Sequence, residues 1–268
     1  MIVKRPQAAF VCIGDEILSG RTQDINLAYL ARWLNRHGVE LAEARVVADL
    51  HKAIADAVNA LRQGYDYVFT SGGIGATHDD ITAESIAQAF KRQLIEDKRA
   101  LEMLHTNYAE SGGVTESRRL LARMPQGADL ICGERIGAPG FRVDNVFVLA
   151  GVPEIFRAML EALADNFTGS DVWHSRTLET YCGETILAMD LARVQQHNAQ
   201  VKIGSYPKHN AVQGYYTQLV FRGPSQSAID RAATEAQNFL RELKVAYKDL
   251  GYVSDEEGMD QTKAGSNQ

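Results

Sequence analysis

The stretch Thr70–Thr82 reads TSGGIGATHDDIT, and it decides the fold because two different periodicities meet in it. The run YDYVFTSG at 65–72 is apolar, aromatic and β-branched, which predicts a buried strand. Residues 82–90 follow a helical pattern. A buried strand that passes through a glycine-rich turn into a helix is typical of a parallel α/β sheet, in which ligands bind where the strands end.

The same alternation continues on both sides of this turn and predicts a mainly parallel sheet with helices on both faces. Short apolar runs at 8–14, 39–48 and 146–151 are predicted strands. Gly38 is suited to end a helix, and Pro153 lies where a helix favours proline, in its first turn. Helices are predicted over 25–38, 51–63, 82–90, 98–108 and 115–124, and from Pro153 onward.

The order of predicted strands and helices changes after residue 171. Strands are predicted at 175–182, 201–207 and 214–223, and helices at 183–198 and 225–243. This βαββα order predicts a small antiparallel sheet with helices on one face. We therefore predict an α/β domain over 1–168, a linker at 168–171, a smaller α+β domain over 172–250 and a disordered polar tail over 251–268.

The composition narrows the class of protein. The chain has 268 residues, of which 45% are hydrophobic and 23% charged, as in ordinary soluble globular proteins. Its net charge of −6 argues against a general nucleic-acid binder, since phosphate backbones attract basic surfaces. Cys12, Cys132 and Cys182 show no metal or disulfide spacing, and no apolar stretch reaches the roughly 18 residues of a membrane span. We expect a cytoplasmic protein without nucleic-acid or membrane partners.

The glycine-rich turn has the chemistry of an anion site. Gly72, Gly73 and Gly75 permit positive φ and carry no side chain, so backbone N–H groups can converge on a phosphate. A helix that starts near Thr82 adds its positive dipole end, and the hydroxyls of Thr77 and Thr82 are further donors.

Two adjacent acids follow the glycines. Asp79 and Asp80 would repel a bare phosphate, so we expect a bridging divalent cation, Mg²⁺ in preference to Mn²⁺ or Co²⁺. The alternative is an ordinary turn in which the two acids cap the next helix. The turn has no Gly-Lys-Ser/Thr of the Walker type and is not a complete GxGxxG dinucleotide fingerprint.

The end of the first strand repeats this pattern. Gly14, Asp15 and Glu16 follow the strand, and Asp24 and Asn26 precede the next helix. Acids at strand ends that face one crevice are suited to a metal or ribose site, and Glu16 or Asp15 is a candidate general base. The alternative is helix capping by Asp24 or Asn26 and a solvated Glu16.

Blocks of sequence in a fixed order carry a family resemblance. They are IGDEILSGRTQDINLAYLARWLNRHGVE from Ile13, VVADLHKAI from Val46, VFTSGGIGATHDDITAESIAQAF from Val68, IGAPGF from Ile136 and LAGVPEIFRAML from Leu149. The chain resembles the molybdopterin-binding-like (MoaB/MogA-type) superfamily, and within it the N-terminal domain of CinA-type proteins. KIGSYPKHN through the last helix resembles the small domain appended there. The resemblance implies a three-layer α/β/α domain with a small α+β domain. The C-terminal amidase domain of CinA-type proteins is not expected, because the chain ends too soon for it.

The positions that match the family's blocks, together with Gly14 and Thr82 from the reasoning above, give a predicted site. Asp80 matches the acid that follows the phosphate-binding loop, and Asp79 is its companion; both are expected to bind the metal. Asp80, Asp79 and Glu16 are expected to be catalytic. The predicted ligand-binding residues are Gly14, Asp15, Asn26, Asp49, Ser71, Gly72, Gly73, Gly75, Thr77, Thr82, Pro139, Gly140, Gly151 and Pro153.

The resemblance also implies an activity. CinA-type members, and the related domain of eukaryotic FAD synthases, are associated with hydrolysis of nucleotide diphosphates such as ADP-ribose or FAD, dependent on a divalent metal and potassium. We therefore expect a nucleotide pyrophosphatase that uses a divalent metal and K⁺ and forms a homo-oligomer. The alternative is a non-hydrolytic protein that binds molybdopterin or a nucleotide in molybdenum cofactor metabolism.

The chain departs from the family pattern at two loop positions. Ala76 and Ala150 stand where CinA-type sequences have proline, which makes these loops less pre-organised but removes no proposed ligand. His78 in the turn and Tyr206 after IGS are further candidates. An exposed loop histidine and a core or interface aromatic are the alternatives for these two.

Overall fold

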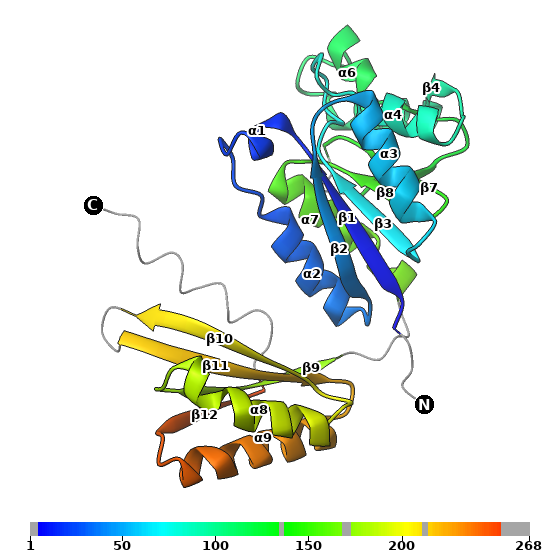
Figure 1. Ribbon diagram of the computed structural model, residues 1–268. Coiled ribbons are helices and arrows are strands. Elements are labelled where there is room, and N and C mark those ends of the chain that lie inside the picture. Colours follow the sequence, from blue (N-terminus) through cyan, green and yellow to red (C-terminus); the bar gives the residue numbers. More distant parts are fainter. Residues whose placement is uncertain (1–4, 134–136, 168–172, 211–213, 253–268) are drawn as a thin grey trace. The chain divides into compact units, whose positions relative to one another are not determined.

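The computed structural model of the protein describes residues 5–133, 137–167, 173–210 and 214–252 (Figure 1). The described residues before position 168 form one unit, and those from 173 to 252 form a second unit. Each unit has its own sheet and its own hydrophobic core. The predicted linker at 168–171 lies outside the described residues.

A six-stranded sheet forms the middle layer of the first unit. Its strands are, in order, β2 (Glu40–Val47), β1 (Gln7–Ile13), β3 (Tyr67–Ser71), β8 (Val146–Leu149), β7 (Gly140–Val143) and β6 (Asp129–Ile131). The pairs β1–β2, β1–β3 and β3–β8 are parallel, whereas β7–β8 and β6–β7 are antiparallel. The predicted mainly parallel sheet is confirmed, and the structure adds an antiparallel edge.

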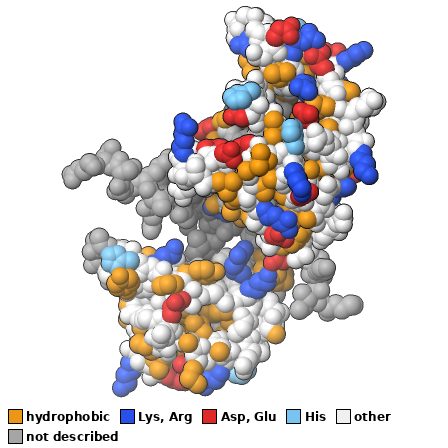
Figure 2. All heavy atoms as spheres, turned by 45° about the horizontal axis from the view of Figure 1, so that its top comes forward, with side chains coloured by type: hydrophobic (Ala, Val, Ile, Leu, Met, Phe, Trp, Pro, Cys, Tyr) orange, Lys and Arg blue, Asp and Glu red, His pale blue; other side chains and the backbone are white. Residues whose placement is uncertain are grey.

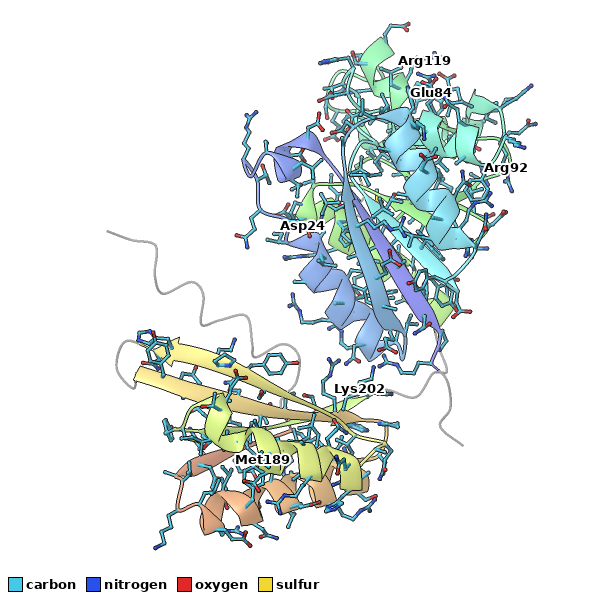
Figure 3. The ribbon with its side chains drawn as sticks, in the orientation of Figure 1. Asp24, Glu84, Arg92, Arg119, Met189 and Lys202 are labelled. Atoms are coloured by element: carbon cyan, nitrogen blue, oxygen red, sulfur yellow. The ribbon has the colours of Figure 1, made fainter. Side chains whose placement is uncertain are left out.

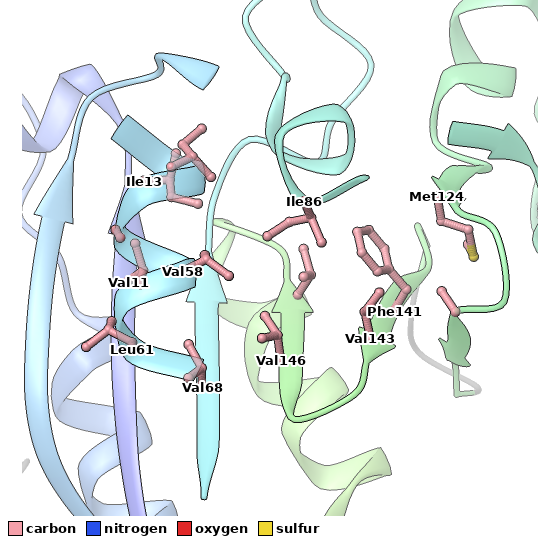
Figure 4. Packing of buried hydrophobic residues seen from close by; sticks show 14 of the residues in the cluster. Val11, Ile13, Val58, Leu61, Val68, Ile86, Met124, Phe141, Val143 and Val146 are labelled. Carbon is pink, nitrogen blue, oxygen red and sulfur yellow. The ribbon is translucent and has the colours of Figure 1, made fainter. Parts of the chain in front are cut away.

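Helices cover both faces of this sheet, as Figure 1 shows: α2 (Asn26–Arg36), α3 (His51–Arg62), α4 (Thr82–Ala89), α5 (Lys98–Asn107) and α7 (Pro153–Ala162). Alternate residues of β1 enter two cores. Phe10 packs with α2 and α7, whereas Val11 packs with α3, α4 and α5, in the core shown in Figure 4. The three-layer α/β/α arrangement is therefore confirmed. None of the helices in the described part of the chain is long and apolar enough to cross a membrane.

The segment between α4 and β6 forms a small two-stranded sheet apart from the main sheet. In it, β4 (Leu94–Glu96) pairs antiparallel with β5 (Arg123–Pro125), and α6 (Glu116–Leu120) lies between them in sequence. The predicted helix over 115–124 was wrong at its end, because Met124 is a buried strand residue. Met124 precedes Pro125, and a residue before proline is disfavoured in the helical region. The short elements α1 (Asp15–Leu18) and β4 were not predicted, and the helix predicted from Pro153 onward is followed by a 3₁₀-helix at Ala164–Phe167.

The second unit has an antiparallel sheet with two helices on one face. The elements follow each other as β9 (His174–Thr180), α8 (Glu184–His197), β10 (Lys202–Asn210), β11 (Gly214–Gly223), α9 (Gln226–Glu242) and β12 (Tyr247–Tyr252). The sheet order is β10-β11-β9-β12, and each neighbouring pair is antiparallel. Leu178, Leu219 and Phe221 of the sheet pack against Val194 of α8 and Ala232 of α9 in one core.

The last strand, β12, was missed from sequence. The tail was predicted to begin at 251, whereas Gly251 and Tyr252 belong to β12, and only residues from 253 lie outside the described part. The strand pairs with β9 through a register shift next to Gly251, whose φ is 71°. Arg176 of β9 bonds both Asp249 and Asp230, which ties the strand to α9. These contacts hold β12 in the sheet, although its sequence lacks a clear strand pattern.

Aromatic side chains fill the core beneath α2. Phe69 and Phe147 stack with ring centroids 4.9 Å apart, and Trp33 and Phe167 meet them edge-on or tilted. Phe69 has no exposed surface. Such pairs add specific ring contacts to the burial of apolar area, so this cluster fixes how β3 and β8 lie under the helix.

We expect Phe69→Ala to lower the free energy of unfolding by about 3–5 kcal/mol, because it removes a buried ring and leaves a cavity. Equilibrium urea denaturation measures this loss. Leu18→Ala, at a residue that is 54% exposed in the same unit, should change the value by no more than about 0.5 kcal/mol. A loss below about 1 kcal/mol for Phe69→Ala would show that the cluster does not support the core.

Candidate active site

The ends of three parallel strands meet at one edge of the sheet. The Gly72 N–H donates to Leu149 O at 3.3 Å, and a Cβ on Gly72 would lie 2.1 Å from Ile13 O at the end of β1. A Cβ on Gly151 would lie 3.3 Å from the Cα of Gly72. The turns after β1, β3 and β8 are therefore in contact, which is the arrangement expected of ligand sites in parallel sheets.

The turn after β3 requires glycine at two positions. Gly72 has a φ of 108°, and a Cβ there would lie 2.1 Å from Ile13 O. Gly73 has a φ of 67°, and a Cβ there would lie 2.2 Å from Thr82 Oγ1. The Thr82 N–H donates to Gly73 O at 2.9 Å, and its hydroxyl donates to Gly72 O at 3.0 Å. Thr82 is fully buried, so it fixes the turn and does not face a ligand.

The carboxylate of Asp80 lies against the amides of its own turn. Its Oδ1 accepts from the Gly75 N–H at 2.7 Å, and its Oδ2 accepts from the Thr77 N–H at 2.8 Å. The Thr77 hydroxyl lies 2.5 Å from both Asp80 Oδ2 and Asp79 Oδ1 and can donate to either. This hydroxyl is the main reason that the pKa of Asp79 is lowered. Asp80 therefore closes the turn, in which two amides are already paired with a negative charge.

A cavity of about 400 Å³ opens at this edge, and we call it the main cavity. Its volume lies at the small end of the roughly 300–1,000 Å³ typical of small-molecule sites. Gly73 and Ile74 line it, and their N–H groups have no acceptor among the described residues. The predicted site residues that line it are Gly14, Glu16, Asp49, Gly72, Gly73, Gly75, Asp79, Asp80 and Gly151. Apolar residues that were not predicted to bind the ligand complete its wall: Ile13, Ile74, Ala138, Ala150, Val152 and Ile155.

The buried Asn26 joins the turns beneath the main cavity. Its Nδ2 donates to Ser71 Oγ at 2.9 Å and to Gly151 O at 2.8 Å. Its Oδ1 is buried and has no hydrogen-bond partner in the described structure. Asn26 and Ser71 are 4% and 2% exposed, so they hold the strand ends together from below.

The other predicted residues surround the cavity without lining it. Thr77 and Pro139 line a second cavity on the far side of the glycine turn. Gly140 begins β7, close to Met159, and Pro153 begins α7. Asp24 caps the entry to α2, because its carboxylate accepts from the N–H groups of Asn26 and Leu27 (Figure 3). The capping alternative is therefore confirmed for Asp24.

Acidic side chains crowd the mouth of the main cavity. The Asp15 N–H donates to Asp49 Oδ2 at 2.8 Å, and the Asp49 N–H donates to Asp15 Oδ1 at 3.4 Å. A Cβ on Gly14 would lie 2.5 Å from Glu16 Oε1, so the Glu16 carboxylate folds over Gly14. Burial raises the pKa of Asp49, and the charges of Asp15, Glu16 and Asp79 raise it further, against the hydrogen bond from Asp15.

Acidic side chains also act on the thiol of Cys12, at the end of β1. Burial, followed by the charge of Asp24 and then that of Glu16, raises the pKa of Cys12 to about 12. Figure 2 shows acidic side chains among hydrophobic ones on one face of the first unit. A phosphate would enter this field at a cost unless a cation accompanied it.

The carboxylates fit a cation that is shared with a ligand. Within the described ranges, no three His, Cys, Asp or Glu side chains are grouped so that they could hold a metal ion. Mg²⁺ is commonly bound by one or two carboxylates together with phosphate oxygens and water. Glu16, Asp49 and Asp79 line the same cavity as the unpaired amides, so the donors suit a metal that a phosphate brings with it.

One departure from the family pattern has a structural role. The N–H of Ala150 donates to the sulfur of Met159 at 3.3 Å, a contact that proline could not make because it has no N–H. Ala150 is buried at the wall of the main cavity. Alanine at this position therefore lacks the rigidity of proline but makes a hydrogen bond to Met159 of α7.

Each of the two units matches a known protein family. Residues 9–168 match the family described as probable molybdopterin binding domain, and the chain belongs to this family. Residues 172–249 match the middle domain of FAD synthase. The crystal structure of the protein CinA from Thermoplasma acidophilum is similar to the chain, with a TM-score of 0.56, 31% identity and coverage of 61% of this chain and 98% of that one. The predicted MoaB/MogA-type, CinA-like membership is confirmed.

Two curated relatives extend the similarity to most of the chain. A protein of Archaeoglobus fulgidus is 31% identical over 87% of this chain and 98% of its own length. A probable FAD synthase of Caenorhabditis elegans is 30% identical over 99% of this chain. The match covers only 56% of that synthase, so the chain spans about half of it. These relationships indicate a nucleotide-related function and a small-molecule ligand of the pterin or nucleotide class.

We expect Gly72→Ala to be far more destabilising than Gly20→Ala. Both glycines have positive φ, but nothing lies within 4 Å of a Cβ on Gly20. Gly20→Ala should therefore cost about 1–2 kcal/mol of unfolding free energy, and Gly72→Ala at least about 2 kcal/mol more because of the clash with Ile13 O. Urea denaturation of both variants measures the difference. Equal losses would show that β1 and the turn do not approach closely.

The raised pKa of Asp49 predicts a pH-dependent loss of stability. As the pH rises from the ordinary value of 3.8 through the raised pKa, the folded chain holds a proton that the unfolded chain has released, so the free energy of unfolding falls. Asp49→Asn keeps an oxygen acceptor for Asp15 but removes the charge. This variant should be more stable than the wild type at pH 7 and similar to it near pH 3. Urea denaturation across this range measures the difference, and a constant difference would contradict the assignment.

Proposed function

We propose that the protein binds the phosphoanhydride of a nucleotide in the main cavity and hydrolyses it with the help of a divalent cation. One observation carries the proposal. The carboxylates Glu16, Asp49 and Asp79 line the same cavity as the unpaired N–H groups of Gly73 and Ile74. Donors for a phosphate and ligands for its counter-ion thus lie at one edge of the sheet.

The backbone would bind the phosphate and the acids would bind the cation. The Gly73 and Ile74 amides are donors for phosphate oxygens, and the adjacent start of α4 contributes its positive dipole end. Asp79 is the more accessible of the two predicted metal ligands, because both Asp80 oxygens already bond the turn. A divalent cation bound there would neutralise phosphoryl charge and lower the pKa of a coordinated water.

Glu16 is the proposed general base. Its carboxylate faces the cavity over Gly14, and no hydrogen bond within the described residues occupies it. Glu16 would take a proton from an attacking water, whose oxygen forms a bond to one phosphorus while the anhydride P–O bond breaks. The electron pair of that bond leaves with the departing phosphate. Hydrolysis of ADP-ribose or FAD by this route gives two monophosphates.

One observation favours a second candidate function. The Asp80 carboxylate already bonds the two turn amides of Gly75 and Thr77, so part of the predicted phosphate loop is filled by the protein itself. A protein that only binds molybdopterin or a nucleotide needs the remaining amides and no positioned water. In this alternative, the acids would tune ligand affinity and perform no chemistry.

An assay of phosphoanhydride hydrolysis tests the proposal. The purified chain is incubated with ADP-ribose, FAD or related dinucleotides and with Mg²⁺, Mn²⁺ or Co²⁺, with and without K⁺. We expect metal-dependent turnover, and we expect Glu16→Gln and Asp79→Asn each to lower kcat/KM by at least about 100-fold. Chelation of the metal should abolish turnover.

A matched variant controls for loss of surface charge. Glu102→Gln makes the same chemical change at an exposed position of α5 and should leave turnover unchanged. Turnover that survives both site variants would refute the assignment of Glu16 and Asp79. Metal-dependent binding of these compounds without any turnover would favour the binding protein instead.

A further inference from the structure

A second cavity of about 180 Å³ lies on the other side of the glycine turn. Its walls come from the turn, from α4, and from the segment between α4 and β6, which contains β4, α6 and β5. Apolar and polar residues both line it, and the polar ones include Glu84, Arg123, His78 and Asp80. The residues that line it are Ile74, Gly75, Thr77, His78, Asp80, Ile81, Ala83, Glu84, Leu94, Leu120, Leu121, Arg123, Pro139 and Phe141.

The second cavity adjoins the main cavity along two loops. Ile74, Gly75 and Asp80 line both cavities. On the opposite wall, the consecutive residues Ala138 and Pro139 line the main and the second cavity, respectively. The two cavities are therefore neighbours at the turn, and a ligand long enough to pass these shared residues would contact both.

The walls of the second cavity suit a flat apolar group. Ile81, Leu94, Leu121 and Phe141 provide its apolar walls. The volume is smaller than the roughly 300–1,000 Å³ that holds a complete small-molecule ligand. It therefore suits one part of a ligand, of the size of a single fused ring system.

The polar side chains of this cavity are suited to the edge of such a ring. Glu84 of α4 (labelled in Figure 3) is a carboxylate acceptor, and its one contact in the described structure is a long one, 3.5 Å, from Gln88. A carboxylate accepts hydrogen bonds from exocyclic amino groups of heteroaromatic rings. The guanidinium of Arg123 can stack on a ring face or donate to ring nitrogens.

We propose that the second cavity binds the amino-bearing heteroaromatic ring, purine or pterin, of the ligand whose phosphates lie in the main cavity. This inference rests on the proposed function, because it assigns the other end of the same ligand. It excludes a flavin ring from this cavity, because isoalloxazine has three fused rings and no exocyclic amino group. An adenine or aminopterin end is thus held by Glu84 and the apolar walls.

Equilibrium binding to the full chain tests the assignment without any turnover. The probes are two matched pairs, adenosine with inosine and pterin with lumazine, in which the second member lacks the amino group. Pyrophosphate with Mg²⁺ probes the main cavity separately. We expect one amino-bearing compound to bind at least tenfold more tightly than its partner, and the pair that does so identifies the ring as purine or pterin.

Two variants locate the site. Ala83→Phe places a ring in the second cavity from α4 and should weaken binding of the amino-bearing compound at least tenfold, while pyrophosphate binding stays unchanged. Glu84→Gln should reduce the preference for the amino-bearing compound to threefold or less. Ala192→Phe, at an exposed position of α8 in the second unit, is the control and should alter neither affinity.

The outcomes separate this inference from the proposed function. The assignment of the second cavity is overturned if Ala83→Phe leaves ring binding intact, or if the chain binds pyrophosphate but no ring. Neither outcome contradicts phosphate binding in the main cavity. If Ala83→Phe removes ring binding in a chain that neither binds pyrophosphate nor hydrolyses dinucleotides, the second cavity is a ring site but the proposed function is overturned, and with it the link between the two cavities.

Discussion

The contact between Gly72 and the carbonyl of Ile13 is the constraint on which the site depends. β1 and β3 are adjacent parallel strands, and the chain leaving β3 passes so close to the end of β1 that a Cβ would lie 2.1 Å from that oxygen. The same residue donates to Leu149 O of β8, so it is held between two strand ends. This close approach brings the turns of three strands together and creates the edge where the cavity opens. Any side chain at this position would separate the groups that form the site.

Asp80 shows how the turn is kept in shape without a ligand. Backbone amides that converge in a turn need an acceptor, and the Asp80 carboxylate supplies one for Gly75 and Thr77. The remaining amides at Gly73 and Ile74 can then face a second anion in a turn that is already rigid. The cost of this arrangement is negative charge, which adds to that of Asp15, Glu16 and Asp49. A bound cation would relieve this repulsion, so the proposed function requires that phosphate binding depend on metal.

Sequence patterns predicted the parts of the fold that depend on local periodicity. The strands before Gly14 and Gly72 and the helix that begins at Pro153 lie where the pattern placed them. A continuous apolar run is typical of a strand buried on both faces, and apolar residues at every third to fourth position are typical of a helix with one buried face. The pattern could not show that Thr82 is buried, since its bond to Gly72 O depends on how the turn folds back. β5 and β12 are short or charged and owe their pairing to distant partners, such as Arg176 for β12. The second cavity likewise joins residues from position 74 to 141, which no local pattern connects.

Met159 explains why the departure at Ala150 is compatible with the family's site. Its sulfur accepts from the Ala150 N–H and also lies 3.1 Å from where a Cβ of Gly140 would be. One side chain of α7 therefore supports the turn after β8 and the start of β7 from below. Of the residues directly before Gly140, Ala138 lines the main cavity and Pro139 lines the second cavity. A sulfur acceptor is weak, but it is buried and adaptable, so it can hold a loop that lacks proline without making it rigid.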